Sequence, residues 1–150
     1  MTLLTSMFDF NNDIICTDRN GVTNDFKYHL KESEEDGNKK WIFMIIPDNN
    51  ISISDWFEFA VTEIDNENGK VTIMSHKNNP EYVAKGIPDK MIEESSIVLN
   101  KNIHSSSNKK EYKSFETEWR SDSATKVWRR LQNQNNADYS ETSDTYTFVN

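Results

Sequence analysis

Residues 79–99 constrain the fold more than any other stretch, because a strand pattern, a turn and a helix pattern meet there. Residues 70–75 alternate apolar and polar side chains, as a half-buried strand does. Gly86 and Pro88 break that pattern, and helical spacing follows up to residue 99. Such a junction is either an ordinary strand-to-helix connection or an anion site, where free N–H groups and the helix dipole converge.

Charge is distributed unevenly along the 150 residues, a length that indicates one domain. The chain carries 25 acidic and 17 basic residues, a net charge of −8, which argues against nucleic acid or an anionic membrane as partner. The whole excess lies in residues 1–75, whereas residues 76–150 are balanced. Residues 101–130 are locally basic, so an anionic ligand is expected in the second half unless these residues form a solvated helix face.

The titratable residues give no metal-ligand pattern. Cys16 is the single cysteine, and three histidines, His29, His76 and His104, are scattered without ligand spacing. No apolar run approaches the 18 residues that a membrane span requires, and the N-terminus lacks the pattern of a signal peptide. We therefore expect a cytoplasmic protein without a metal site.

The first half, residues 1–76, predicts a meander of about four strands. Residues 26–30 and 57–61 alternate with period two, and residues 41–46 are a continuous apolar run that ends at Pro47. The turn at 65–69 joins 57–61 to 70–75 as an antiparallel hairpin. Residues 1–15 fit a short strand or a helical turn equally well.

The second half, residues 77–150, predicts helix, strand, helix and hairpin. The first helix spans 88–99 and a strand follows at 103–107. The second helix is the clearest element, because apolar residues recur at 124, 127, 128 and 131. A closing hairpin is expected over 137–148. The fold class is thus a single α+β (mixed α/β) domain, with a mostly antiparallel twisted sheet of about six or seven strands and two main helices.

The order of elements over roughly residues 70–149 resembles the GNAT family of N-acetyltransferases. Residues 80–88, read as Pro-Glu-Tyr-Val-Ala-Lys-Gly-Ile-Pro, are similar to the loop that in this family holds the pyrophosphate of acetyl-coenzyme A (acetyl-CoA). Residues 123–131 are similar to the family's next helix. The chain departs from the family at Val83, where Arg or Gln is usual, at Pro88, where Gly or Ala is usual, and at Trp128, where a catalytic Tyr is frequent.

The resemblance implies an acetyl-CoA-dependent transfer of an acetyl group to a small-molecule or protein amine, with the cofactor bound by the 83–90 loop and the second helix. The cofactor-binding residues that it implies are Val83, Ala84, Lys85, Gly86, Ile87, Asp89, Lys90 and Arg129. If the loop binds pyrophosphate, a Gly86→Trp substitution is expected to abolish binding without unfolding the domain.

Catalysis by this route requires a base for the amine and an acid for the thiolate. Glu58 and Glu63 are the candidate bases, although both also fit solvent-facing positions on a strand. Ser106 and Tyr139 are the candidate acids or water-orienting groups, although a loop hydroxyl and a packed aromatic ring explain them as well.

A second function class is compatible with the same sequence. A catalytically inactive GNAT-like module, such as an inhibitor or immunity-type protein, would bind a protein partner without coenzyme A, and fold alone does not separate the two classes. The acidic run Glu32, Glu34, Glu35 and Asp36 is then a candidate contact for a basic partner, or simply a charged hairpin tip. Coenzyme A binding discriminates between the two hypotheses.

Overall fold

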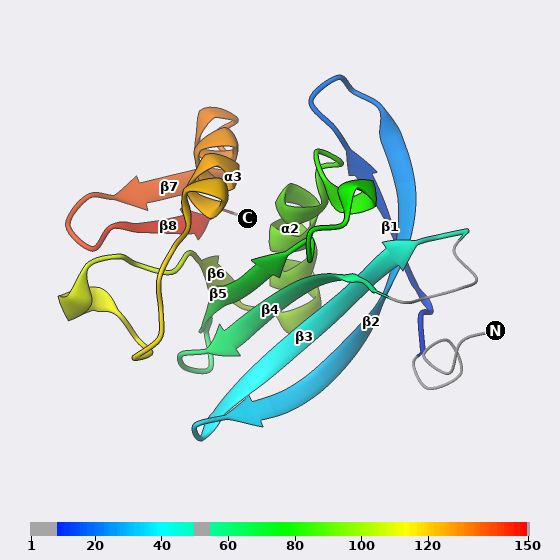
Figure 1. Cartoon of the computed structure of the whole chain (residues 1–150). Coiled ribbons are helices and arrows are strands. Elements are labelled where there is room, and N and C mark those ends of the chain that lie inside the picture. The colour runs from blue at the N-terminus through cyan, green and yellow to red at the C-terminus, as the bar shows by residue number, and fades with distance from the viewer. Residues whose placement is uncertain (1–8, 50–54, 150) are drawn as a thin grey trace.

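The computed structural model describes residues 9–49 and 55–149 of the chain (Figure 1). The prediction for 1–15 therefore lies mostly outside the described residues, and the loop expected at 48–55 lies partly outside them. The described residues form eight strands, two α-helices and two 3₁₀ turns. The strands are β1 (Asn12–Thr17), β2 (Thr23–Glu35), β3 (Asn38–Pro47), β4 (Phe57–Glu63), β5 (Asn68–Ser75), β6 (Asn102–His104), β7 (Ala137–Ser140) and β8 (Thr145–Phe148). The helices are α2 (Ile87–Leu99) and α3 (Asp122–Asn133), and the 3₁₀ turns are η1 (Pro80–Tyr82) and η2 (Lys110–Tyr112).

All eight strands belong to one sheet in the order β1-β2-β3-β4-β5-β6-β8-β7. Neighbouring strands are antiparallel except for β5 and β6, which α2 connects as a parallel pair. A parallel pair requires such a crossover, because the chain leaves β5 at one end of the sheet and must return to the end at which β5 began before β6 can run in the same direction. The α+β class, the mostly antiparallel sheet and the two helices are confirmed, whereas the sheet has eight strands rather than six or seven.

The additional strand is β1, which overlaps residues 1–15, where the sequence left a short strand and a helical turn open. It pairs with β2 from Asn12↔Tyr28 to Thr17↔Thr23, and only Ile14 and Cys16 of its six residues are buried. Two inward side chains are too short a pattern to separate a strand from a turn. The β2 strand is also longer than the predicted 26–30, because its charged end pairs with β3 up to Glu35↔Asn38.

The turn between β2 and β3 contains two residues, Asp36 and Gly37, with φ angles of 52° and 83°. Two left-handed residues in a row match the twist of a two-residue hairpin turn, which favours Asp-Gly. The hairpin therefore has a defined tip at Asp36–Gly37, next to the acidic run that the sequence analysis gave as a possible charged hairpin tip.

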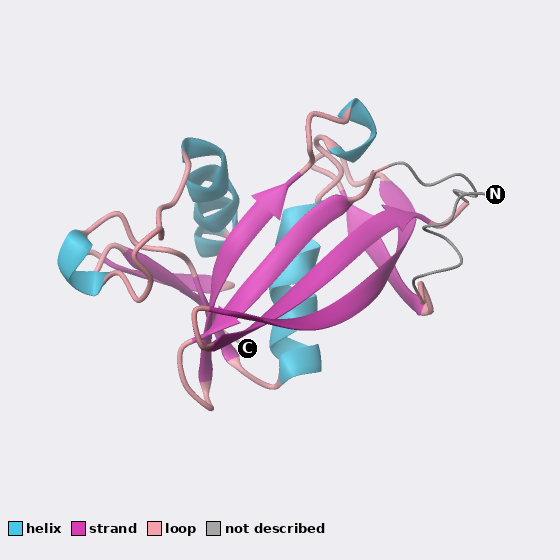
Figure 2. Ribbon diagram, turned by 60° about the horizontal axis from the view of Figure 1, so that its bottom comes forward, coloured by secondary structure: helices cyan, strands magenta, loops and turns pink. Residues whose placement is uncertain are grey.

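One face of the meander packs against α2, as Figures 1 and 2 show. Phe43, Phe59 and Val61 point to this face and are fully buried, and α2 covers them with Met91 and Ile92. Because side chains alternate along a strand, their neighbours in sequence point to the opposite face, which neither helix covers. We call this opposite side the helix-free face.

The α3 helix forms as its sequence predicts. Its N-cap is Ser121, whose Oγ accepts a hydrogen bond from the Ala124 amide at 3.1 Å. Val127, Trp128 and Leu131 are buried, and the helix contacts α2 and β7. Among the described residues, no helix is long and apolar enough to cross a membrane.

Candidate functional site

The parallel strands β5 and β6 separate after three residue pairs. Pairing ends at Lys70↔His104, whereas β5 continues to Ser75. Residues 105–107 follow β6 and hydrogen-bond to the β7–β8 hairpin: the Ser105 amide donates to the Tyr146 carbonyl and the Ser107 hydroxyl to the Ser143 carbonyl. Beyond Lys70, β5 therefore has an edge that no described strand pairs with. Unpaired strand edges offer alternating N–H and C=O groups to an extended ligand.

A hollow of about 150 Å³ lies at this separation. The β5 residues 71–74 form one side, and Ser106, Arg120 and Trp128 contribute to the other. Ser106 is almost fully buried, and its hydroxyl donates a 2.8 Å hydrogen bond to the Val71 carbonyl at the edge of β5. The structure thus brings one predicted catalytic residue, Ser106, to the point where the two strands diverge. We call this cavity the divergence hollow.

Trp119 lines the divergence hollow and is 68% exposed, which is unusual for a tryptophan. It stands between two buried charged residues, Glu118 and Arg120. The buried side chains of Glu118 and Arg120 fix the backbone on either side of Trp119, which places this residue at the rim of the hollow.

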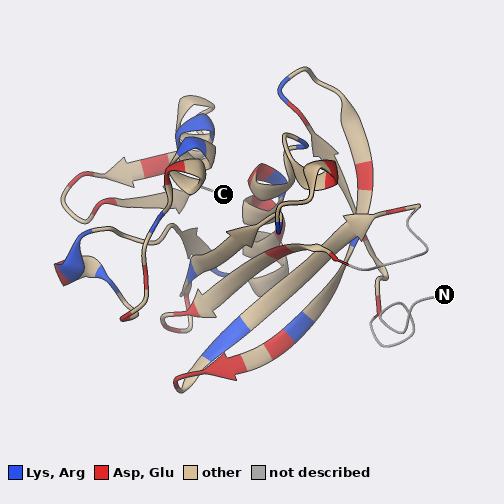
Figure 3. Cartoon of the chain, viewed as in Figure 1, with Lys and Arg blue, Asp and Glu red and all other residues tan. Residues whose placement is uncertain are grey.

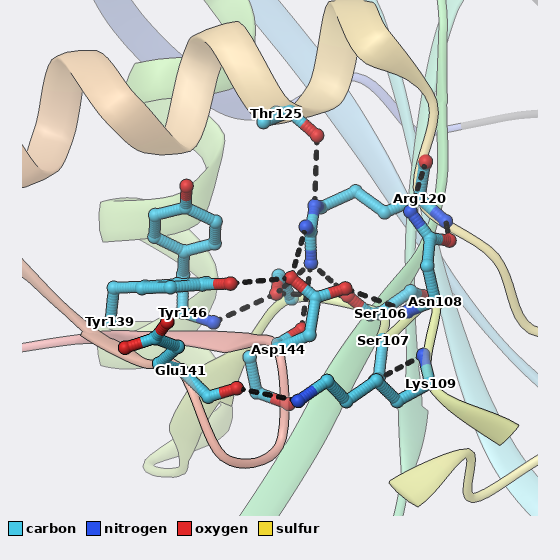
Figure 4. A network of polar contacts seen from close by, with 12 residues as sticks. Ser106, Ser107, Asn108, Lys109, Arg120, Thr125, Tyr139, Glu141, Asp144 and Tyr146 are labelled. Atoms are coloured by element: carbon cyan, nitrogen blue, oxygen red, sulfur yellow. Dashed lines mark hydrogen bonds and ion pairs between the residues drawn. The ribbon is translucent and has the colours of Figure 1, made fainter.

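Arg120 organises the polar network beside the hollow (Figure 4). Its guanidinium donates to the Ser106 carbonyl at 2.8 Å, to the Thr125 hydroxyl at 2.9 Å, and to both the carbonyl and the carboxylate of Asp144 at 2.8 and 2.7 Å. Planar Arg donors suit such multiple acceptors. Arg120 therefore joins the segment after β6, the start of α3 and the β7–β8 turn.

Tyr139 enters the same network from β7. Its hydroxyl donates to Asp144 Oδ1 at 2.8 Å, and this hydrogen bond, together with slight burial, raises the pKa of Tyr139. Partial burial acts to raise the pKa of Asp144, but the hydrogen bonds from Arg120 and Tyr139 outweigh it and lower that pKa. Tyr139 is thus a protonated hydroxyl linked to Ser106 through Asp144 and Arg120.

Glu118 holds the segment between β6 and α3 against β5. Its side chain is fully buried and forms a 2.8 Å ion pair with Lys70, whose side chain is 6% exposed. The other carboxylate contacts are with the backbone amides of Ser107, at 2.6 Å, Ser114, at 2.8 Å, and Phe115, at 3.3 Å. Every oxygen of this buried carboxylate is therefore hydrogen-bonded, as burial of a charge requires.

A second cavity, of about 400 Å³, lies between the N-terminus of α2 and the side of α3; we call it the α2–α3 groove. Of the predicted cofactor-binding residues, Val83, Ala84, Gly86 and Asp89 line it. The first intrahelical bond of α2 runs from the Lys90 amide to the Gly86 carbonyl, so the Ile87 and Asp89 amides belong to the unsatisfied first turn. Pro88 contributes no donor.

Gly86 is required by the fold as well as by any ligand. Its φ of 79° is left-handed, and a Cβ atom at this position would lie 2.1 Å from the Thr17 carbonyl oxygen of β1. The expectation that Gly86→Trp leaves the domain folded is therefore wrong, because the Cβ clashes with backbone before the rest of the side chain is placed. Substitutions on α3 are better probes of the groove.

The basic residues around the groove differ in part from those predicted. Arg130 and Lys126 line it, and Arg130 pairs with Asp89 at 2.8 Å. Arg129 is exposed and does not line the groove, and Lys90 instead pairs with Glu93 at 3.1 Å. Two further predicted cofactor-binding residues lie elsewhere: Ile87 is buried in the core and Lys85 lines a different surface cavity.

The two candidate bases lie on opposite faces of β4, near its two ends. Glu58 accepts a hydrogen bond from Trp56 Nε1 at 3.1 Å and lies 3.5 Å from Lys77. Glu63 pairs with Lys101 at 3.1 Å. Neither carboxylate lines the divergence hollow. The structure therefore brings Ser106 and Tyr139 into one network and leaves Glu58 and Glu63 outside it.

Sequence reasoning missed Glu118, Trp119 and Arg120, because residues 109–119 show no periodicity. Burial of two opposite charges on either side of an exposed tryptophan has no local sequence signature. The single cysteine, Cys16, is buried, and burial raises the pKa of its thiol to about 12, so it is not a nucleophile candidate. Among the described residues, no group of three or more His, Cys, Asp or Glu side chains is arranged to hold a metal ion.

Comparison of this chain with protein-family models, with curated proteins and with solved structures finds no match.

Proposed function

We propose that this chain is a GNAT-like protein that binds an acyl-coenzyme A and transfers its acyl group to an amine. The observation that carries the proposal is the separation of β5 and β6, the one parallel pair of the described sheet, beside the divergence hollow. The sequence resemblance implied the order strand, loop, helix, strand, helix and hairpin, and the order β5, α2, β6, α3, β7 and β8 agrees with it.

The free edge of β5 suits the pantetheine arm of a coenzyme A thioester. This arm is an extended chain with two amide groups, and amides pair with an exposed strand edge as an added strand does. The edge begins at Val71, beside Ser106, so a thioester at the end of the arm would lie in the divergence hollow. There it would lie within reach of hydroxyl donors that polarise a carbonyl.

The α2–α3 groove suits the anionic part of the cofactor. The first turn of α2 opens onto it, and three basic side chains, Arg19, Lys126 and Arg130, line it. Asp18 and Asp89 offset part of this charge, and Asp89 already holds Arg130. Lys126 is therefore the basic residue that we expect to contribute most to phosphate binding.

The reaction forms a carbon–nitrogen bond, breaks the carbon–sulfur bond of the thioester and moves one proton from the amine side to the sulfur side. The amine nitrogen attacks the thioester carbonyl and loses a proton, the carbon–sulfur bond breaks, and the thiolate takes up a proton. Tyr139, whose pKa is raised, stays protonated at neutral pH and is our candidate acid for the thiolate, acting through water because it does not line the divergence hollow. Glu58 and Glu63 remain candidate bases for the amine, through water.

A binding module on the same scaffold is the second candidate function. The divergence hollow, at about 150 Å³, is smaller than the 300–1,000 Å³ typical of ligand pockets. In addition, the hydroxyl of Ser106 and the guanidinium of Arg120 already have partners inside the protein. Both features favour a protein that keeps the fold without the chemistry, and whose partner is another protein.

Isothermal titration with acetyl-CoA separates the two functions. We expect saturable binding near the micromolar range, about −8 kcal/mol, for the intact protein. Lys126→Glu should weaken binding severalfold, since it reverses a charge in the α2–α3 groove. Arg129→Glu, the same charge change on the exposed side of α3, is the matched control and should bind as the unaltered protein does.

Two results would contradict the proposal. The first is an absence of heat and of thermal stabilisation at millimolar acetyl-CoA, which would leave the binding module as the function. The second is equal weakening by Lys126→Glu and Arg129→Glu, which would mean that the ligand responds to net charge and not to the groove.

A further inference from the structure

We infer that the free edge of β5 is a docking site for an extended segment of another protein, which adds to the sheet as a strand and places one apolar side chain in the divergence hollow. The inference deepens the second candidate function, the binding module, by naming the form of its partner. It rests on the proposed function only in that the partner and the coenzyme A thioester would use the same edge, so the two ligands should exclude each other.

The main chain of β5 offers a place for one more strand. Val71 turns its carbonyl away from β4 and accepts a 2.8 Å hydrogen bond from the Ser106 hydroxyl. In an antiparallel ladder, successive residues point their N–H and C=O groups to opposite sides, and the bulge opposite Ala60 and Val61 adds one residue to this count. Met74 is therefore the next residue that directs its N–H and C=O groups to the free edge. An extended segment supplies matching groups, as an added strand does.

The divergence hollow beside this edge has room for one side chain. Its volume, about 150 Å³, is that of a cavity able to hold a benzene ring. Met74 of β5 and Ala124 and Trp128 of α3 give it apolar walls. A leucine or phenylalanine side chain that projects from the added strand fits this space, and its burial is favourable.

The polar groups at the hollow favour an apolar occupant. Ser106 already donates to the Val71 carbonyl, and the Arg120 guanidinium is bonded to acceptors of its own chain. The Ser121 hydroxyl oxygen caps α3. A polar occupant would lose its hydration and find these groups engaged, which costs free energy, whereas an apolar side chain needs no partner.

Trp119 gives the hollow an exposed aromatic rim. Its 68% exposure leaves most of the ring in water, and an apolar group of this size gains when a partner covers it. Tryptophan is also enriched among the few residues that carry most of the binding energy at protein interfaces. Because the buried neighbours Glu118 and Arg120 fix the backbone here, little order has to be gained on binding.

The charge of the chain favours a basic segment. The net charge is −8, and Figure 3 shows acidic residues concentrated at the β2–β3 hairpin tip. Alternate side chains of an added strand would point to the helix-free face, where the exposed Glu116 lines a surface cavity together with Thr72 and Ile73. Such charges raise the association rate of a basic partner. The expected segment therefore combines one large apolar residue with Lys or Arg.

Random heptapeptides displayed on phage are the probe. Selection against the intact protein should enrich sequences with a single Leu or Phe among β-branched and basic residues. A synthetic peptide of the selected sequence should bind Ala124→Leu about tenfold or more weakly, because the new side chain fills the hollow and excludes the anchor. Gln132→Leu, which adds the same side chain on the exposed side of α3, is the matched control and should bind as the unaltered protein does.

Two N-methylated forms of the selected peptide test for strand addition on the unaltered protein. One form carries methyl groups on alternate amides, and the other carries them on the remaining amides. Only one set of amides faces β5 in an added strand, so one form should lose binding and the other should keep it.

Three results would overturn the inference: no enrichment, equal binding to the unaltered protein and to Ala124→Leu, or equal loss of binding by both methylated forms. The proposed function is tested separately by adding acetyl-CoA. Peptide binding without acetyl-CoA binding leaves the docking site and removes the transferase, and acetyl-CoA binding without peptide binding does the opposite. If both bind, saturating peptide should displace acetyl-CoA, and binding of both at once would overturn the shared edge.

Discussion

Two ion pairs of the same type show how differently the two parts of the molecule are held together. In the meander β1–β5, Lys39 lies 3.7 Å from Glu32, and both side chains are more than half exposed. Where the meander meets the C-terminal part, Lys70 lies 2.8 Å from Glu118, and both are buried. The exposed pair lies on the surface of a hairpin that apolar packing already stabilises. The buried pair is itself one of the interactions that hold residues 105–121 against β5.

The interiors of the two parts differ in the same way. Phe43, Ile45 and Phe59 of the meander are fully buried, and apolar packing is not directional. Around β6 the buried side chains include Ser105, Ser106, Ser107, Glu118 and Arg120, each with specific hydrogen-bond partners. Apolar packing tolerates small changes of shape, but a buried polar network fails when one member is removed. The meander should therefore be tolerant and the C-terminal part brittle.

The largest effect is expected for Glu118→Gln, which leaves Lys70 buried without a counter-ion. We expect a loss of about 3–5 kcal/mol in the free energy of unfolding. Urea denaturation measures it, and Lys70→Met combined with Glu118→Gln is the control, since removal of both charges should recover most of the loss while the carbonyl oxygen of the glutamine can still accept from the backbone amides that contact Glu118. A near-neutral single variant would show that this part is not held by its buried charges.

A smaller effect is expected for Phe59→Leu in the meander. Leucine nearly fills the same apolar space, so the free energy of unfolding should fall by about 1.5 kcal/mol or less, although Phe59 is fully buried. The same urea experiment measures it. A loss as large as that of Glu118→Gln would remove the contrast between a tolerant and a brittle interior.

The stability of the contact between the meander and the C-terminal part should depend on pH through His104. His104 on β6 contacts Asn68 at the start of β5 and Thr147 on β8, at 2.7 and 2.8 Å. Burial, and secondarily the charge of Lys70, lowers the pKa of His104 below 6.5. The folded state then binds fewer protons than the unfolded state, so stability is complete above pH 6.5 and falls as the pH drops through the folded pKa.

Urea denaturation at several pH values, compared with His104→Gln, isolates this contribution. The difference between the two proteins should change as pH falls below 6.5, by no more than about 1.4 kcal/mol per pH unit, which is the limit for one proton. A constant difference across that interval would mean that protonation of His104 does not affect the contact between the two parts.

The smallest effect is expected for Lys39→Ala at the exposed pair. Its free energy of unfolding should change by about 0.5 kcal/mol or less, and less still at high salt. Thermal denaturation at two salt concentrations is sufficient to test it. A change comparable with that of Glu118→Gln would indicate that exposure does not set the value of an ion pair in this protein.

The same contrast explains how far the sequence predicts the fold. The strands β3, β4 and β5 form as predicted over residues 41–46, 57–61 and 70–75. Their apolar side chains are buried by local alternation or by a continuous apolar run, which the sequence shows directly. The apolar spacing of α3 and its Ser121 cap are local signals, and both are confirmed. The strand β1 overlaps residues 1–15, where the sequence left a strand and a helical turn open because two buried side chains make a weak pattern.

The candidate site was less accessible to prediction because its contacts are distant in sequence. Lys70 meets Glu118 and Arg120 meets Asp144, pairs that no local pattern links. On α3, Arg130 lines the α2–α3 groove and Arg129 does not. Adjacent helix positions differ by about 100° of rotation, so which of the two faces the groove depends on how α3 packs. The roles given to Glu58, Glu63, Ser106 and Tyr139 remain predictions.

The place of β8 in the sheet sets the order in which the chain can assemble during synthesis. β8 follows β7 along the chain but lies between β6 and β7 in the sheet. In a nascent chain, β7 therefore has no strand to pair with until β8 has also been synthesised. Synthesis proceeds at about 5–20 residues per second. Until then the β5–β6 side is an open edge, and the ribosome-bound protein is exposed to mispairing and to chaperones.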